Sequence, residues 1–350
     1  MKNAEDVGTK MAASGAVQTL EPTQPFYATC KRSRDLARER GMSEAALLAA
    51  HDGPEVVRLG GEIPDLIRAL PDLGEVMSLT RNEAAVHEKT GTFGNISVSG
   101  QIGLVLNDAI DLRLFLQHWC TVFAVEIPDE TGPRRSLQVF DRSGDAVIKV
   151  HLKPASDVAA FERVRARFAD PEPAALPDAP AELQDAAPSG PIDVAGFRQA
   201  FETMGDVHEF FPLLGRFGLS RRQALDLVDG HYARPAAGAA IRTLLERAAA
   251  DALPIMCFVG NRGCIQIHHG PVATIKVMGP WLNVLDPGFN LHLREDLVAE
   301  SWVVRKPTRH GLITSLELYA ADQGLIAQFF GVRDEREPED PAWRALATGL

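Results

Sequence analysis

A long internal repeat is the feature that most constrains this 350-residue chain. Residues 82–140 align with residues 261–319 at a constant spacing of 179 residues, so that Asn82 falls on Asn261 and no gap is needed. Of the 59 aligned positions 14 are identical, whereas ordinary composition would give about four by chance. The spacing is too long for a solenoid and predicts two copies of one domain.

A change in composition marks the boundary between the copies. The stretch between Phe168 and Asp193 is dense in proline, alanine and acidic residues and has no helical or strand periodicity. Such a stretch is typical of a semi-rigid linker. We therefore expect a loose tail over 1–25, an N-terminal repeat over 26–168, a linker over 169–192 and a C-terminal repeat over 193–350.

Each repeat starts with helical sequence and continues into short β-prone runs. LARERGMSEAALLAA in the first repeat and AGAAIRTLLERAAA in the second are helical in composition. Runs such as IDLRLFL and CTVFAVEI follow at close spacing, as expected for antiparallel meanders. The pattern predicts an α+β fold with internal duplication, in which two similar halves each carry a large antiparallel sheet flanked by helices.

Composition and charge exclude several classes of function. The net charge of −11 argues against nucleic acid as the primary partner, because phosphate binding needs a basic field. The chain contains no run of 18 apolar residues, so we expect no membrane span. The first 25 residues also lack the apolar core of a signal peptide. The four cysteines form no C-x-x-C pair, so we expect a cytoplasmic protein.

His208 lies in the segment FRQAFETMGDVHEFFPLL. Together with Phe197, Phe201, Met204 and Phe211 it follows steps of four and three residues, which predict one apolar stripe on a helix. One interpretation is a core histidine that is bonded to a carbonyl group. The other is a neutral imidazole that faces a metal or a flat apolar cofactor.

Arg113 lies in the alternating strand sequence IDLRLFL. The alternation places leucines on the core face and Arg113 with Phe115 on the opposite face. That face meets either solvent or a cleft between the halves. The repeat aligns Arg113 with His292, so the two copies differ at this position.

Two segments near the C-terminus combine basic and aromatic residues, namely Arg305-Lys306-Pro307 and Phe329-Phe330-Gly331-Val332-Arg333. Cations beside aromatic rings can hold an amphipathic anion by charge-assisted hydrogen bonds and ring contacts. Exposed strand ends are the alternative interpretation, since most lysines and arginines face solvent.

The chain resembles the bacterial cytoplasmic hemin-degrading and hemin-transport proteins of the HmuS/HemS/ChuS type. The resemblance extends from about residue 30 to the C-terminal region. Its most specific segments are RNEAAVHEKTGTF (81–93), DLRLFLQHW (111–119), DVHEFF (206–211), VGNRGCIQI (259–267), WLNVLDPGFNLHL (281–293), RKPTRHGLITSLEL (305–318) and IAQFFGVR (326–333).

This resemblance implies haem b (hemin) in a cleft between sheet and helices of the C-terminal half, closed over by the N-terminal half. It implies His208 as the ligand of the iron and Arg113 as the distal residue, with Phe115 on the same side. Many relatives carry tyrosine at the position of Phe330. The other residues implied to contact haem are Arg221, Phe258, Lys306, Phe330 and Arg333. Of these the resemblance implies Lys306 and Arg333 as the propionate-binding residues, Arg221 as a further basic contact and Phe258 as a wall of the pocket.

Two functions share this implied site. One is degradation of haem with release of iron, which requires an external reductase because no flavin or nicotinamide motif is found. The other is a haem carrier that delivers its cargo to a haem oxygenase. An inner-membrane haem transporter is a further expected partner in iron acquisition. His87 is retained as an alternative iron ligand for a second haem on the N-terminal half.

Overall fold

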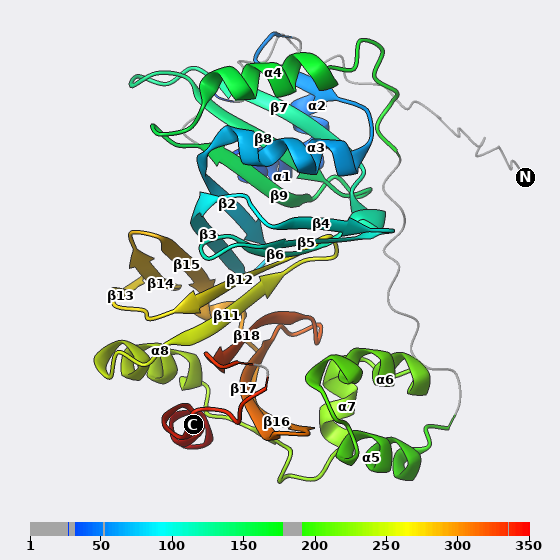
Figure 1. The fold of residues 1–350 in the computed structure, drawn as a ribbon, viewed down its shortest axis with the longest axis vertical. Helices are drawn as coiled ribbons and strands as arrows, with labels where there is room; N and C mark the ends of the chain where they lie inside the picture. The colour runs from blue at the N-terminus through cyan, green and yellow to red at the C-terminus, as the bar shows by residue number, and fades with distance from the viewer. Residues whose placement is uncertain (1–26, 28–31, 52, 178–190, 335) are drawn as a thin grey trace, which may run out of the picture.

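The computed structural model describes residue 27 and residues 32–51, 53–177, 191–334 and 336–350 (Figure 1). The predicted tail over 1–25 and the middle of the predicted linker lie outside the described residues. No helix in the described ranges is long and apolar enough to span a membrane.

The N-terminal half contains four α-helices, two 3₁₀ helices and nine strands among its described residues. In chain order they are α1 (Ser33–Glu39), α2 (Glu44–Ala49), β1 (Val56–Leu59), α3 (Ile63–Ala69), η2 (Leu70–Leu73), β2 (Glu75–Arg81), β3 (Ala85–Thr92), β4 (Ile96–Ser99), β5 (Ile102–Leu106), β6 (Asp111–Phe115), η3 (Leu116–His118), β7 (Thr121–Ile127), β8 (Arg134–Phe140), β9 (Ala146–Leu152) and α4 (Val158–Phe168).

The C-terminal half repeats this succession of elements with an additional helical segment at its start. In chain order they are α5 (Val194–Glu202), η4 (Val207–Glu209), α6 (Phe210–Phe217), α7 (Arg221–Leu227), β10 (Ala233–Pro235), α8 (Ala240–Ala250), β11 (Ile255–Gly260), β12 (Cys264–Gly270), β13 (Ile275–Met278), β14 (Trp281–Asp286), β15 (Phe289–Arg294), η5 (Glu295–Leu297), β16 (Glu300–Thr308), β17 (Gly311–Tyr319), β18 (Leu325–Gly331) and α9 (Pro341–Thr348).

The 179-residue spacing is visible in the elements themselves. Shifted by that number, β4, η3 and β9 coincide with β13, η5 and β18 at both ends. The helical segments that precede the strands also correspond, at a spacing of 177 residues (218 − 41): Gly41 and Gly218 both adopt a left-handed conformation, with φ of 66° and 64°. Ser43 and Ser220 then cap the next helix through a bond to a backbone N–H. Equivalent residues therefore end one helix and begin the next in the same way in both halves.

The two halves exchange strands. The N-terminal sheet has the order β1-β7-β8-β9-β2-β3-β15-β14-β13, and the C-terminal sheet has the order β10-β16-β17-β18-β11-β12-β6-β5-β4. Each nine-stranded sheet thus takes three strands from the other half. The predicted α+β class with two large antiparallel sheets is confirmed, but the sequence did not reveal the exchange, because alternation fixes the face of a strand and not its neighbour.

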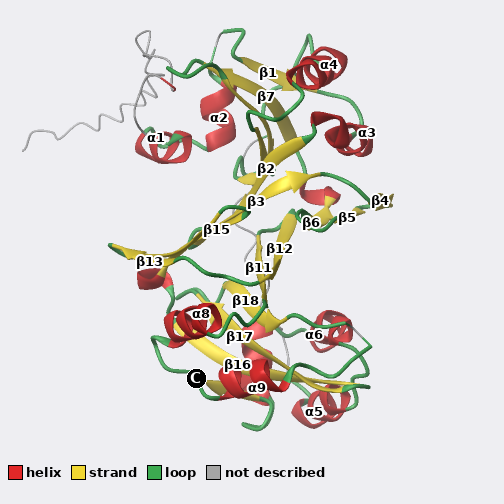
Figure 2. Ribbon diagram, turned by 60° about the vertical axis from the view of Figure 1, so that its left-hand side comes forward, coloured by secondary structure: helices red, strands yellow, loops and turns green. Residues whose placement is uncertain are grey.

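Each sheet lies between two layers of helices (Figure 2). In the N-terminal half, α1 and α2 pack on one face, and α3 and α4 pack on the other. In the C-terminal half, α8 and α9 cover one face, while α5, α6 and α7 pack on the opposite face over β16 and β17. The stretch of that face formed by β11, β12 and β6 extends beyond these three helices (Figure 1).

Two equivalent asparagines join the halves. Asn82 donates to the carbonyl groups of Gly260 and Ile326, at 3.1 and 2.8 Å. Asn261 donates in turn to the carbonyl group of Arg81 at 3.0 Å. Each side-chain oxygen also accepts two backbone N–H bonds within its own turn. The side-chain amides of both asparagines therefore use their N–H groups and their oxygen in hydrogen bonds where the halves meet, a contact that we call the joint.

Replacing Asn261 by alanine should destabilise the whole protein. Asn261→Ala leaves several backbone groups of the joint without partners, so we expect the free energy of unfolding to fall by about 2–4 kcal/mol. Urea denaturation followed by circular dichroism measures this. Asn290→Ala is the control, because that side chain makes a single 3.3 Å bond to Glu88. Equal, small losses in the two variants would contradict the role of the joint.

Candidate functional site

One face of the C-terminal sheet carries residues from both halves. Arg113 on β6 is paired with Ile265 on β12. Directly paired residues, and residues two apart along a strand, point to the same side of a sheet. By this rule the face continues from Arg113 to Phe258 on β11, Phe330 on β18 and Lys306 on β16. We call it the mixed face.

Arg113 reaches the mixed face through the strand exchange. The predicted alternation is confirmed, since Leu112 and Leu114 are buried and Arg113 and Phe115 are half-exposed. The guanidinium forms an ion pair with Asp111 and keeps 35 % of its side chain exposed. Because β6 is hydrogen-bonded to β12, this residue of the N-terminal half belongs to the sheet of the C-terminal half.

His208 does not continue the apolar stripe of the preceding helix. Helix α5 ends at Glu202, and His208 lies in the short η4 that follows. Phe197 and Phe201 are buried as predicted, whereas the His208 side chain is 73 % exposed. The prediction of one helix was wrong because Asp206 begins a new turn by accepting a 2.8 Å bond from the His208 backbone N–H. The buried-core interpretation of His208 is excluded as well.

The His208 ring is oriented by a carboxylate. Its Nδ1 lies 2.6 Å from Oδ1 of Asp206, so Nδ1–H donates and Nε2 retains its lone pair. The pKa of Asp206 is lowered, first by the backbone bond from His208 and also by the ring and the charge of Arg333. A carboxylate that fixes the tautomer of an exposed imidazole is the usual arrangement behind a metal-binding histidine.

The segment carrying His208 is held against the β16–β17 hairpin. The backbone N–H of Arg309 donates to the carbonyl group of Gly205 at 3.0 Å. Two residues after His208, the buried ring of Phe210 lies 5.0 Å from Nζ of Lys306 and 5.2 Å from Cζ of Arg221. The ring of Phe210, which is close to His208 in the sequence, therefore packs against both Lys306 and Arg221.

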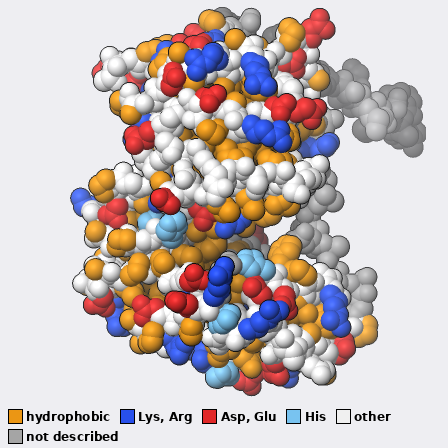
Figure 3. Space-filling view, in the orientation of Figure 1, with side chains coloured by type: hydrophobic (Ala, Val, Ile, Leu, Met, Phe, Trp, Pro, Cys, Tyr) orange, Lys and Arg blue, Asp and Glu red, His pale blue; other side chains and the backbone are white. Residues whose placement is uncertain are grey.

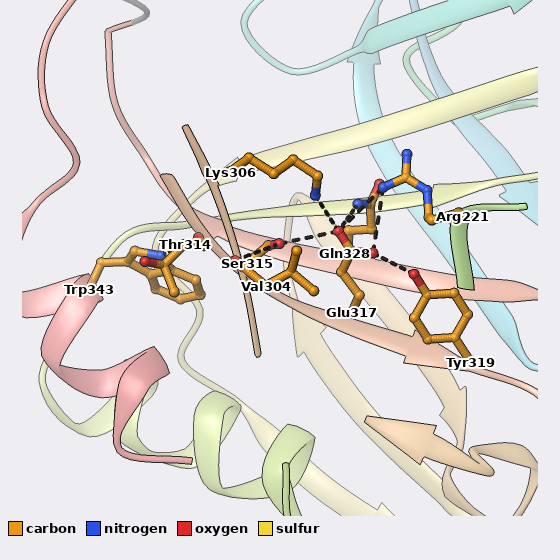
Figure 4. Close-up of polar contacts among 9 residues, drawn as sticks. All are labelled: Arg221, Val304, Lys306, Thr314, Ser315, Glu317, Tyr319, Gln328 and Trp343. Atoms are coloured by element: carbon orange, nitrogen blue, oxygen red, sulfur yellow. Dashed lines mark hydrogen bonds and ion pairs between the residues drawn. The ribbon is translucent and has the colours of Figure 1, made fainter. Parts of the chain in front are cut away.

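A buried carboxylate organises these cations (Figure 4). Glu317 on β17 accepts bonds from Nζ of Lys306 at 2.6 Å, Oη of Tyr319 at 2.6 Å and Nε2 of Gln328 at 2.9 Å, and it pairs with Arg221 at 3.3 Å. Burial alone would raise the pKa of Glu317, but Lys306 and Arg221 outweigh it and hold the pKa well below its usual range. We call these five residues the Glu317 cluster.

The sequence prediction missed three members of this cluster. Glu317, Tyr319 and Gln328 were not among the candidate residues, and Lys306 was expected to bind an anion or end an exposed strand. Lys306 is only 3 % exposed. The available signal was the alternation in TSLELY, which places Glu317 and Tyr319 on one face of a strand, although alternation alone does not show that this face is buried.

Donors remain for an anionic ligand at this end of the mixed face. The ammonium of Lys306 has three N–H groups, of which Glu317 receives one. Nε of Arg333 is buried and has no acceptor within the described part of the chain. Two cations and one carboxylate also leave the Glu317 cluster with a net positive charge. A ligand with carboxylates would satisfy these groups.

Aromatic rings form the apolar part of the face. Phe258 and Phe330 meet edge to face, with ring centroids 5.2 Å apart. Because residue 330 is phenylalanine, this ring offers no hydroxyl group for a hydrogen bond. The surface is hollowed between the β4–β6 hairpin and the helices α5 to α7 (Figure 3). Rings, unsatisfied donors and an oriented imidazole together fit a flat apolar molecule that carries carboxylates and a metal.

His87 lies elsewhere, in the interior between the two sheets. It is fully buried, and its Nδ1 accepts a 2.8 Å bond from Nε2 of Gln266. Burial, and then the nearby His268 and Lys89, keep the pKa of His87 well below its ordinary value. Haem iron could reach Nε2 of His87 only if the two sheets separated. This arrangement therefore does not favour His87 as the ligand of a second haem.

Removing the charge of Glu317 should leave Lys306 buried without its counter-ion. For Glu317→Gln we expect a loss of about 3–5 kcal/mol in the free energy of unfolding at neutral pH, measured by urea denaturation. The pKa of Glu317 in the folded protein lies below its ordinary value of 4.5. The charged carboxylate therefore stabilises the folded state fully above pH 4.5, and this stabilisation is lost as the pH falls towards the lowered pKa. The difference between the two proteins should therefore narrow below about pH 4.5. Glu202→Gln on the exposed side of α5 is the control, and an equal loss there would refute the assignment.

Known proteins of similar sequence match most of this chain. The family profile described as the haemin-degrading HemS.ChuX domain matches residues 41–168 and 218–350. The hemin transport protein HmuS of Yersinia pestis is 42 % identical over 315 residues, which are 90 % of this chain and 91 % of that protein. The resemblance found in the sequence is confirmed.

Solved structures match over nearly the whole chain. ChuS, described as an E. coli heme oxygenase, is 40 % identical with a TM-score of 0.86, covering 93 % of this chain and 98 % of its own. Holo-PhuS, described as a heme-binding protein from Pseudomonas aeruginosa, is 45 % identical with a TM-score of 0.86, covering 91 % and 94 %. The exchanged two-sheet architecture thus has close structural relatives.

Proposed function

Because the chain belongs to the haemin-degrading HemS/ChuX family, we propose that it binds haem on the mixed face, with His208 as the ligand of the iron. The observation that carries the proposal is the exposed imidazole of His208, whose Nδ1 is bonded to Asp206 at 2.6 Å. This bond leaves Nε2 free as the ligating atom.

The remaining contacts follow from the chemistry of haem, which is a flat apolar ring with two carboxylates. Phe258 and Phe330 supply apolar contact, and Arg221, Lys306 and Arg333 supply the cations for the propionates. On a chain of net charge −11 such a group of cations is local and specific. Relatives described as heme-binding, such as PhuS, support the same ligand.

Arg113 and Phe115 would line the opposite side of the haem. A guanidinium donates hydrogen bonds and does not ligate iron under ordinary conditions. Arg113 could then donate hydrogen bonds to a small molecule bound at the haem, while the ion pair with Asp111 orients the arginine side chain. When bound, haem supplies the iron at which oxygen chemistry takes place. This arrangement supports degradation of haem with release of iron, driven by an external reductase.

The second candidate function is a haem carrier. The relative from Yersinia pestis is described as a hemin transport protein, which favours this alternative. In that case the mixed face sequesters haem received from an inner-membrane transporter and delivers it to a haem oxygenase. The resemblance to cytoplasmic family members carries the further proposal that the protein acts in the cytoplasm. Both functions use the same residues.

Substitution of His208 tests the iron ligand. In His208→Ala the imidazole is lost, so we expect haem affinity to fall about ten-fold or more and the absorption spectrum of the complex to change. Titration of the purified protein with haem measures both. His310→Ala, in the exposed turn between β16 and β17, is the matched control. An unchanged spectrum and affinity in the His208 variant would sink the assignment.

An assay with reductant distinguishes the enzyme from the carrier. The haem complex is incubated with a reductant and catalase, and the Soret band and the products are followed. Degradation in the presence of catalase supports the enzyme, whereas a band that survives unless peroxide accumulates supports the carrier.

If the protein is an enzyme, Arg113→Gln should slow degradation about 100-fold, because one preorganised donor is lost. Haem affinity should change little, since the propionate contacts remain. Arg163→Gln, an exposed arginine on α4, is the control. Equal rates in the wild type and in Arg113→Gln would exclude a catalytic role for the arginine.

A further inference from the structure

The N-terminal half contains a cavity of about 430 Å³ that the proposed haem site does not use. It lies on the face of the N-terminal sheet that corresponds to the mixed face. Its lining includes residues that the 179-residue spacing aligns with Phe258, Phe330, Lys306, Glu317 and Arg113. In the same order these residues are Leu79, His151, Ile127, Gln138 and His292.

The aligned positions of this cavity carry different side chains from those of the mixed face. Leucine and histidine replace the two phenylalanines, and isoleucine replaces the buried lysine. The lining has five cationic side chains but only two acidic ones, Glu44 and Glu88. The cations are Arg32, Arg34, Arg81, Arg134 and Lys149. On a chain of net charge −11 this is a concentration of positive charge in a concave site.

Only some of these charges are neutralised within the protein. Lys149 is paired with Glu44, Arg34 with Glu83, and Arg134 with Asp129 at 2.9 Å.

The guanidinium groups of Arg32 and Arg81, by contrast, have no ion pair with any described residue. In addition, Oε1 of Gln138 is buried at the cavity and has no donor within the described ranges. Arg32 is exposed and can be solvated, but Arg81 is half-buried, and the unsatisfied acceptor of Gln138 is buried beside it in the cavity lining. A buried acceptor without a donor next to a cation without an acidic partner in the described ranges indicates a place for a polar ligand.

Haem is a poor occupant on physical grounds. Its apolar ring could contact Leu79, Val125 and Ile127, but it would also remove water from the cationic groups of the lining without providing partners for them, which is costly. A compact anion with several oxygen atoms would instead pair with Arg32 and Arg81 in charge-assisted bonds. A hydroxyl group on the same molecule would supply the donor that Gln138 lacks.

We propose that the N-terminal cavity is a second ligand site, which takes a small oxyanion of at least two negative charges rather than haem. The two copies of the domain would then have acquired different ligands, one amphipathic and one fully polar. This proposal does not depend on the identity of the iron ligand, because it rests on a separate cavity.

Isothermal titration with citrate and with pyrophosphate tests the proposal, on the protein both with and without haem. We expect one anion to bind per chain in either state, with citrate tighter because its hydroxyl can donate to Gln138. Tighter binding of pyrophosphate would assign the same site to phosphate. Arg81→Gln should weaken binding ten-fold or more, and Gln138→Glu should do so by charge repulsion.

Arg163→Gln on α4 serves as the control and should bind like the wild type. Haem titration and circular dichroism verify that each variant is folded. The proposal is overturned if neither anion binds at millimolar concentration, or if Arg81→Gln binds as tightly as the control. It is also overturned if a second haem binds per chain and His151→Ala abolishes that second binding.

Discussion

The main-chain pairing of β6 with β12, and of β3 with β15, is the interaction on which the rest of the structure depends. These ladders carry a hairpin of each half into the sheet of the other half. Register in a ladder is fixed by hydrogen bonds, so Arg113 is held opposite Ile265 and cannot move independently of the C-terminal sheet. Separation of the halves would expose four long strand edges, which are prone to aggregation.

Duplication followed by divergence explains how one fold offers two different faces. The two halves place equivalent residues at equivalent points of their sheets, as Asn82 and Asn261 show by making the same type of bonds. Differences at a few positions then change the chemistry of each face. Where one face has Phe330 and a buried carboxylate, the other has His151 and the neutral Gln138.

Much of the fold followed from the sequence, because the repeat and the alternation are local signals. The burial of Leu112 and the opposite orientation of Arg113 follow directly from a period of two. The strand exchange could not be predicted, since neighbouring strands are chosen by contacts distant in sequence. The position of His208 was missed because the side chain of Asp206 competes for the backbone and ends the helix. The role of Glu317 was hidden because a buried carboxylate and an exposed one have the same sequence pattern.

In the proposed site, residues of both halves meet around one ligand on the mixed face. A crystal structure of the haem complex is the most direct measurement. We expect iron bound by Nε2 of His208, with the guanidinium of Arg113 on the opposite side of the macrocycle and the propionates at the Glu317 cluster. Haem seated in the N-terminal cavity, or iron ligated by another residue, would contradict the proposed site.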